Sequence, residues 1–465
     1  MAEKSQSKIL KEKLFTQKKN GYKQFKDIEK MQSFCEDYKI FLNNAKTERE
    51  ANREIIKTLE SKGFKPFERG ATLNTGDKIY INNRNKAVLA AVIGKEDISK
   101  GLNIIASHID SPRLDLKPNP LYEDGELALL KTHYYGGIKK YQWTAIPLSL
   151  HGVVVKGDGS CIEVTIGEDE SDPVFCITDL LPHLAVEQMK RDLKNGIKGE
   201  ELNILIGSMP FIFEDDEASE AVKLNILNIL NEKYGLTEDD FLSAELELVP
   251  QFKAKNVGFD NSLIGSYGQD DRVCAYTSLQ ALLQLETPEK TAVAVFADKE
   301  EIGSTGNTGL RCKYLMYFIE DLAHHYNVCP HTVFENSACI SADVNSAYDP
   351  TFGDVFEKRN CAQLNHGIVV TKYTGAGGKS GASDASAEFV GKIRKLFDEN
   401  GVIWQTGELG KVDNGGGGTV AAYIANLNID TLDVGVPVLS MHAPFEITSK
   451  LDVYMAYLSY LAFFK

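Results

Sequence analysis

The sequence lacks the features of a membrane protein or a nucleic-acid-binding protein. Its 465 residues contain no apolar run near the ~20 residues that a bilayer span requires. Basic residues are scarcer than acidic ones, 51 against 66, and the formal net charge is −15. This balance excludes nucleic acid and anionic membranes as expected partners, because both attract an excess of positive charge.

The eight cysteines are scattered, and no two of them form a CxxC pair. Zinc fingers and disulfide scaffolds, which depend on regular cysteine spacing, are therefore excluded. The first 20 residues are rich in Lys and Gln and have no apolar signal core, which predicts a frayed or partner-docking segment of a cytoplasmic protein. Internal repeats, low-complexity tracts and coiled-coil heptads are absent as well.

The first 110 residues indicate a helix followed by strands. Apolar residues recur at three-to-four spacing after Phe25 and predict a helix over 25–63 that ends at Gly63. Two strand-like runs follow, at 87–93 and 102–107.

The pattern of apolar and polar residues changes between Ser111 and Val249. Short β-like runs are separated there by Gly, Pro and acidic clusters, and they lie at 152–155, 162–166, 174–177 and 245–249. This change predicts a β-rich domain inserted between two parts of another domain.

After Asn256, predicted helices alternate with apolar strands. The helices lie at 271–285 and 385–397, and the strands at 292–296, 338–341, 368–370 and 432–434. Such alternation predicts an α/β fold, an open and largely parallel sheet with helices on both faces.

Several acidic residues and histidines lie at or just after the ends of predicted strands. In open α/β sheets, ligands bind beyond the carboxyl ends of the strands, so these residues are candidates for a binding site. His108 ends one predicted strand, and Asp110 follows it by two residues. Imidazole is a good zinc ligand, and a carboxylate on its other ring nitrogen would fix its tautomer. Taken alone, His108 is better explained as a hydrogen-bonded loop residue.

Two pairs of neighbouring carboxylates follow the same logic. Asp270 and Asp271 precede a predicted helix, where one of them could bridge two cations or simply cap the helix. Glu300 and Glu301 follow the strand at 292–297, and adjacent carboxylates repel each other unless a cation neutralises them. One of this pair could bind a metal while the other acts as general base, although a solvated acidic turn is the alternative.

Asp343 and His442 complete the set. Each follows an apolar strand, and neither indicates a metal alone. With the preceding segments they supply His, Asp, Glu, Asp and His in chain order, and two zinc ions that share one carboxylate need about five such ligands. The sequence therefore predicts two Zn²⁺ ions per chain, with Mn²⁺ or Co²⁺ as alternatives.

Over nearly its whole length the chain resembles the family of aspartyl aminopeptidase and vacuolar aminopeptidase I. The motifs that carry this resemblance, in order and at matching spacing, are Lys46-Thr47-Glu48-Arg49-Glu50, Ser107-His108-Ile109-Asp110-Ser111-Pro112, Leu181-Pro182-His183-Leu184, Gly268-Gln269-Asp270-Asp271-Arg272, Glu300-Glu301-Ile302-Gly303-Ser304, Ser341-Ala342-Asp343 and Met441-His442.

The resemblance implies a role for each candidate residue. It makes Glu300 the general base and Asp270 the bridging metal ligand, with Asp271 as the less favoured choice. The other metal ligands that it implies are His108, Glu301, Asp343 and His442. Asp110 matches a carboxylate that supports the first metal site. His183 matches a residue that binds either metal or, as we favour, substrate at the site of a neighbouring subunit.

The resemblance also implies an architecture and an activity. Residues 1–111 and 256–465 would form one catalytic domain, and residues 112–255 an inserted β-rich dimerisation domain. Relatives assemble from dimers into a tetrahedral dodecamer that admits short peptides and excludes folded proteins. The implied activity is that of a zinc-dependent aminopeptidase, which removes N-terminal residues from peptides.

The chain departs from the acid-specific relatives at the expected substrate pocket. Ser346 stands where they carry His, and the strand at 367–371 lacks their Lys unless Lys372 takes its place. A neutral or broad preference is therefore at least as well supported as an acidic one. A related two-metal deacylase or carboxypeptidase and a non-catalytic shell protein are alternative functions. A P-loop at 375–380 is disfavoured, because Tyr373 replaces its first Gly.

Overall fold

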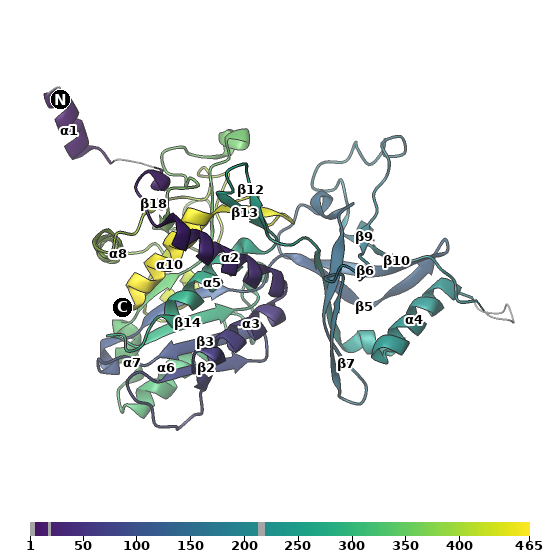
Figure 1. Ribbon diagram of the computed structural model, residues 1–465, viewed down its shortest axis with the longest axis horizontal. Helices are drawn as coiled ribbons and strands as arrows, with labels where there is room; N and C mark the ends of the chain where they lie inside the picture. Colours follow the sequence, from purple (N-terminus) through teal and green to yellow (C-terminus); the bar gives the residue numbers. More distant parts are fainter. Residues whose placement is uncertain (1–4, 17–19, 213–218) are drawn as a thin grey trace.

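The computed structural model describes residues 5–16, 20–212 and 219–465. Two lobes lie side by side, a larger one that contains both chain ends and a smaller, mainly β lobe (Figure 1). The described strands form three sheets, of nine, seven and five strands.

The larger lobe is built on a nine-stranded sheet in the order β1-β2-β3-β14-β4-β15-β19-β17-β18. Its strands are β1 (Lys65–Pro66), β2 (Lys78–Asn83), β3 (Ala87–Val92), β4 (Asn103–His108), β14 (Ala292–Ala297), β15 (Ala338–Ser341), β17 (Ile368–Thr371), β18 (Trp404–Thr406) and β19 (Asp430–Gly435). The central strands β14, β4, β15 and β19 are parallel, whereas β3 and β17 run antiparallel to β14 and β19. The expected mixed α/β architecture is confirmed.

Helices cover both faces of this sheet (Figure 1). One face packs against α2 (Ile28–Asn44), α3 (Glu48–Ser61), α5 (Gln269–Leu283), α8 (Ala387–Glu399) and α10 (Lys450–Phe464), and the other against α6 (Tyr314–His325), α7 (Pro330–Asn336) and α9 (Ala421–Ala425). Along β3, the side chains of Val88 and Ala90 are buried in the core on the α2 side of the sheet, and that of Leu89 is buried in the core on the α6 side. Burial on both faces explains why such strands are continuously apolar in sequence.

The single helix predicted over 25–63 is wrong, because the structure has two helices, α2 and α3, there. The chain leaves the helical conformation at Ala45, and Thr47 caps the second helix. The Thr47 hydroxyl accepts the Glu50 N–H, and the Glu50 carboxylate accepts the Thr47 N–H in return. The Thr-x-x-Glu pattern of this capping box is present in the sequence and marks the start of the second helix.

The smaller lobe is an antiparallel seven-stranded sheet in the order β8-β7-β11-β5-β6-β10-β9. Its elements are β5 (Arg113–Asp124), β6 (Leu127–Tyr135), β7 (Leu148–Val155), β8 (Cys161–Ile166), β9 (Cys176–Ile177), β10 (Ile204–Gly207), β11 (Ala244–Pro250) and the helix α4 (Ala221–Tyr234). The lobe has its own buried core around Trp143, separate from the two cores of the large sheet.

A small third sheet was not predicted from the sequence. Its order is β12-β13-β21-β20-β16, and its strands are β12 (Lys255–Val257), β13 (Leu263–Ser266), β16 (Asn345–Ser346), β20 (Pro437–Leu439) and β21 (Glu446–Ser449). It pairs segments that are almost 190 residues apart, such as Leu263 with Ser449. Short strands with such distant partners give little local signal.

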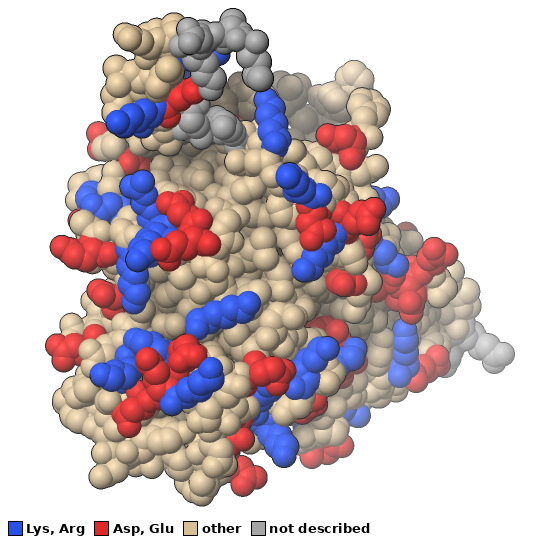
Figure 2. All heavy atoms as spheres, turned by 60° about the vertical axis from the view of Figure 1, so that its left-hand side comes forward, with Lys and Arg blue, Asp and Glu red and all other residues tan. Residues whose placement is uncertain are grey.

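The remaining elements are the N-terminal helix and several short 3-10 helices. The N-terminal helix α1 (Gln6–Leu14) buries none of its residues and projects from the large lobe (Figure 1). Short 3-10 helices lie at Gly21–Lys23, Ile98–Lys100, Lys140–Trp143, Gly199–Glu201, Glu238–Ser243, Glu300–Ile302 and Pro350–Val355. None of the helices in the described parts of the chain has the length and apolarity to cross a bilayer. Acidic and basic side chains are interleaved on the face in Figure 2.

Candidate metal centre

Three neighbouring parallel strands direct potential ligands to one edge of the large sheet. β4 ends at His108, and β14 ends just before the 3-10 helix that carries Glu300 and Glu301. Asp343 follows the end of β15 by two residues. Since β14, β4 and β15 are parallel neighbours, their carboxyl ends bring these side chains together, as the sequence predicted.

The small sheet brings two further residues to the same place. Asp270 follows β13 at the start of α5, and His442 lies in the link between β20 and β21. Glu446 joins these two segments: its buried carboxylate accepts the backbone N–H groups of Gln269 at 2.6 Å, Asp270 at 3.1 Å and His442 at 2.8 Å. Sequence reasoning missed Glu446, whose only signal was a carboxylate close to His442.

The Asp270 carboxylate lies between the two histidines. Its Oδ1 is 3.3 Å from His108 Nε2, and its Oδ2 is 3.1 Å from His442 Nε2. Glu301 Oε2 is 3.6 Å from His442 Nε2, and Asp343 Oδ1 is 3.9 Å from His108 Nε2. Ligands about 2.0–2.2 Å from a tetrahedral zinc ion lie about 3.3–3.6 Å from each other. The spacing of the four side chains around Asp270 is close to that of metal ligands.

Both imidazoles are oriented by contacts on their other nitrogen. His442 Nδ1 is 2.8 Å from the carbonyl oxygen of Gly137, and His108 Nδ1 is 3.1 Å from that of Asp110. Asp110 Oδ1 is also 3.4 Å from His108 Nδ1. Hydrogen bonds at Nδ1 leave Nε2 of each ring directed at the carboxylates, the arrangement usual for metal-binding histidines.

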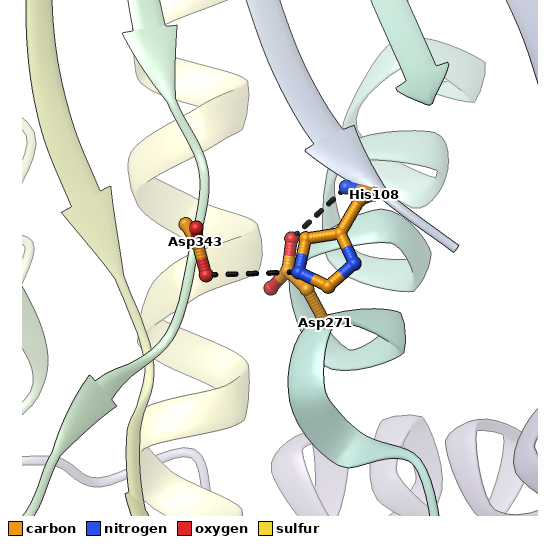
Figure 3. Close-up of side chains that lie close together, drawn as sticks. All are labelled: His108, Asp271 and Asp343. Atoms are coloured by element: carbon orange, nitrogen blue, oxygen red, sulfur yellow. Dashed lines mark hydrogen bonds and ion pairs between the residues drawn. The ribbon is translucent and has the colours of Figure 1, made fainter. Parts of the chain in front are cut away.

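Asp271 lies beside this cluster (Figure 3). Its Oδ2 accepts the backbone N–H of His108 at 3.2 Å. His108, Asp271 and Asp343 offer ligand atoms within 4.8 Å of one another, and so do His108, Asp270 and Glu301. Asp271 Oδ1 and Glu301 Oε1 are buried without a hydrogen-bond partner. A bound cation would satisfy Glu301 Oε1 and would offset the negative charge of Asp271, so the residues present fit a metal.

The electrostatics of the cluster agree with this fit. Burial raises the pKa values of Glu300, Glu301 and Asp343, and neighbouring carboxylates raise them further. The pKa of Asp270 lies below its usual value. Burial alone would raise it, but the hydrogen bonds from His108 and His442 have the larger effect. Crowded carboxylates in a buried site ionise together only if positive charge is supplied.

The cluster opens into a cavity of about 520 Å³. Gly415–Thr419 and part of the Gly375–Ser380 segment line its wall. In a P-loop, a helix begins directly after the glycine-rich loop. After the Gly375–Ser380 segment, the next helix begins only at Ala387. Neither Ser346 nor Lys372 lines this cavity.

His183 is the one predicted site residue that the structure leaves outside the cluster. It lies on an exposed turn in the smaller lobe. None of the contacts among the described residues joins it to His108, His442 or the cavity.

Residues 41–464 match the family described as "Aminopeptidase I zinc metalloprotease (M18)". The chain belongs to this M18 family. A protein of Clostridium acetobutylicum named probable M18 family aminopeptidase 1 is 48% identical over 460 residues, which cover 97% of this chain and 98% of the relative. The chain is thus a member of a family of zinc-dependent hydrolases that act as aminopeptidases.

Solved M18 structures share this fold. The crystal structure of the M18 aminopeptidase of Thermotoga maritima has a TM-score of 0.93 at 46% identity, over 97% of this chain and all of that one. A structure of the S. cerevisiae mApe1 dodecamer has a TM-score of 0.76 at 21% identity, over 94% of this chain and 97% of that one. The second likeness concerns the fold alone.

The contacts of Glu446 in this M18 chain predict that it controls metal affinity. In the Glu446→Gln variant an NH₂ group replaces one acceptor oxygen. Because it cannot accept a hydrogen bond from a backbone N–H, the backbone of Asp270 or His442 is no longer held in place. We expect zinc affinity to fall roughly tenfold to a hundredfold, as measured by competition with a chromogenic chelator. The exposed Glu286 provides a matched Glu→Gln control that should leave affinity unchanged. Equal affinities for both variants would contradict the role of Glu446.

Proposed function

We propose that the protein is an aminopeptidase whose site would hold two zinc ions, with Asp270 as the ligand that they would share. The observation that supports this most directly is that the two oxygens of Asp270 face two different histidines, at 3.3 and 3.1 Å. His108 and Asp343 would complete one ion's protein ligands, and Glu301 and His442 those of the other. Mn²⁺ and Co²⁺ suit the same ligands.

Divalent ions held by these residues would supply a nucleophilic water at neutral pH and would polarise the scissile carbonyl. Glu300 is suited to move the proton. It lines the cavity, and its Oε2 is 3.9 Å from His108 Nε2, yet it belongs to neither of the two candidate ligand groups. We propose that Glu300 removes a proton from the attacking water and delivers it to the leaving amine. Burial raises its pKa, as such a base requires.

Asp110 and Asp271 are proposed as supporting residues. Asp110 orients the His108 ring, and Asp271 holds the backbone N–H of the same residue. Because Asp271 Oδ2 is engaged by that N–H, Asp270 is the better bridging ligand of the two. Conversely, both oxygens of Asp270 are directed at histidine nitrogens.

The cavity favours a broad preference for the N-terminal residue. Its wall beyond the proposed metal ligands combines three apolar residues with charges of both signs: Leu409, Val412 and Met441, the cations Lys379 and Lys411, and the acid Glu408. A wall of this mixed character gives no single charge for which to select. We therefore propose neutral and mixed substrates in preference to strictly acidic ones.

Digestion of a peptide tests this function against deacylase and carboxypeptidase activity. We expect mass spectrometry to show a ladder shortened one residue at a time from the N-terminus. A chelator should abolish the ladder, and added zinc should restore it with two ions bound per chain, since removal of the metals removes the nucleophile. Shortening from the C-terminus, or hydrolysis that persists without metal, would contradict the proposal.

The neighbouring glutamates should differ in what their loss affects. The Glu300→Gln variant should keep its zinc and lose about a hundredfold to ten-thousandfold in kcat, the usual contribution of a general base. The matched Glu301→Gln variant should lose zinc affinity, because it removes a ligand. Metal analysis and kinetics on both variants measure this. Near-native turnover of Glu300→Gln would eliminate it as the base.

We propose that residues 112–255 form an inserted domain that mediates dimerisation within a cytoplasmic tetrahedral dodecamer. A cluster of exposed apolar side chains lies on the loop that carries His183, namely Leu181, Leu184, Met189 and Leu193. Exposed apolar patches of this kind usually mark contacts with another protein. The solved S. cerevisiae mApe1 dodecamer has the same fold. From this loop, His183 would reach the substrate of a neighbouring subunit.

Subunit mixing tests both the assembly and the role of His183. Light scattering should give about 620 kDa for twelve chains of 51.4 kDa. The His183→Ala variant should lose about a hundredfold in kcat, because we propose that His183 stabilises the oxyanion that develops on the substrate. Reassembly of His183→Ala with Glu300→Gln chains should restore activity, because each chain supplies what the other lacks. A lack of restoration in mixed oligomers would exclude action across the interface.

A further inference from the structure

One side chain of the smaller lobe reaches the metal cluster. Tyr135 is the last residue of β6, and its hydroxyl donates a hydrogen bond to Asp110 Oδ2 at 2.8 Å. Asp110 has no exposed surface, and Tyr135 is 8% exposed, so water cannot readily replace this contact. The seven-stranded sheet thus touches a residue that orients His108.

Asp110 fixes more than the histidine ring. Its Oδ1 accepts the backbone N–H of Glu300 at 3.1 Å, and its Oδ2 accepts that of Glu301 at 3.2 Å. A carboxylate offers about four acceptor positions. His108 Nδ1, the two N–H groups and the Tyr135 hydroxyl make four neighbours for these positions. Without the hydroxyl, the carboxylate would be free to tilt, and its contacts to three functional residues would change together.

The Tyr135 ring is itself held in place. The Arg113 guanidinium lies 3.9 Å from the centre of the ring, and the two residues are directly opposite each other in the β5–β6 ladder. Arg113 is anchored in turn by ion pairs with Glu48 at 3.2 Å, Asp115 at 2.8 Å and Glu247 at 3.1 Å. A buried cation against an aromatic face is stabilising and orients the ring.

We propose that Tyr135 is a positioning residue of the reaction, which acts through Asp110 on His108, Glu300 and Glu301. The smaller lobe thereby takes part in building the active site, in addition to any contact between subunits. The proposal rests on the function proposed above, since it assigns Asp110 to the support of a ligand and a base. Tyr135 does not line the cavity, so it acts on the geometry of the site and not on the substrate.

Tyr267 provides a matched control. Its hydroxyl donates to the carbonyl oxygen of Pro112 at 2.9 Å, and it is 4% exposed. Both tyrosines therefore tie the segment between β4 and β5 through one buried hydrogen bond, but only Tyr135 bonds to Asp110. Tyr→Phe exchange at either position removes one hydroxyl and keeps the ring.

The test compares zinc affinity and steady-state kinetics of the two variants. Tyr135→Phe should weaken zinc binding roughly tenfold and lower kcat by a similar factor, with a smaller change in KM. Tyr267→Phe should change each of these values less than about twofold, and both variants should lose similar thermal stability. If Tyr135→Phe and Tyr267→Phe match in zinc affinity and in kcat, the proposal is overturned.

A double-mutant cycle with Asp110→Asn provides an independent measurement. If Tyr135 acts through Asp110, adding Tyr135→Phe to Asp110→Asn should change zinc affinity by less than about twofold. Full additivity of the two effects would overturn the proposal. Zinc affinity is measurable even if the wild-type protein hydrolyses no peptide, so failure of the proposed function and failure of this inference give different results.

Discussion

The negative charge concentrated at one edge of the large sheet is the constraint on which the site depends. The carboxylates that share this buried space are Asp270, Asp271, Glu300, Glu301 and Asp343. Two histidines cannot balance them, and burial makes each unpaired charge costly. Cations relieve the repulsion, and the spacing around Asp270 is suited to receive them. Binding of metal would therefore also stabilise the fold in this region.

Two buried acids that are not proposed as ligands, Glu446 and Asp110, hold the segments that carry the proposed ligands in fixed positions relative to one another. Glu446 gathers backbone N–H groups from the start of α5 and from the loop after β20. Asp110 does the same for the 3-10 helix after β14. Each acid binds the backbone next to a proposed ligand and leaves the ligand's side chain available. The positions of the proposed ligands are thus set by hydrogen bonds to two residues that are not themselves proposed as ligands.

The sequence predicted the parts of the site whose signal is local. His108, Glu300 and Asp343 follow apolar runs that are buried strands, and parallel pairing of those strands was enough to bring them together. The five-stranded sheet and Glu446 could not be predicted in this way, because they depend on the pairing of short segments from opposite ends of the chain. The break between α2 and α3 was missed for another reason, since the Thr47 capping box competed with a strong apolar period. The proposed action of His183 at a neighbouring subunit has no local signal in the sequence and is inferred from the family resemblance.

The connection between the lobes explains why the β-rich lobe matters to the site. Only four residues, 109–112, separate the proposed metal ligand His108 at the end of β4 from Arg113 at the start of β5. A strand of the smaller lobe therefore begins close to the candidate metal centre, and the ladder partner of Arg113 is Tyr135. Any displacement of that sheet would be transmitted to Asp110 through a short, buried path. A lobe attached at this point cannot serve as an independent assembly module, because its register with the large sheet is part of the geometry of the site.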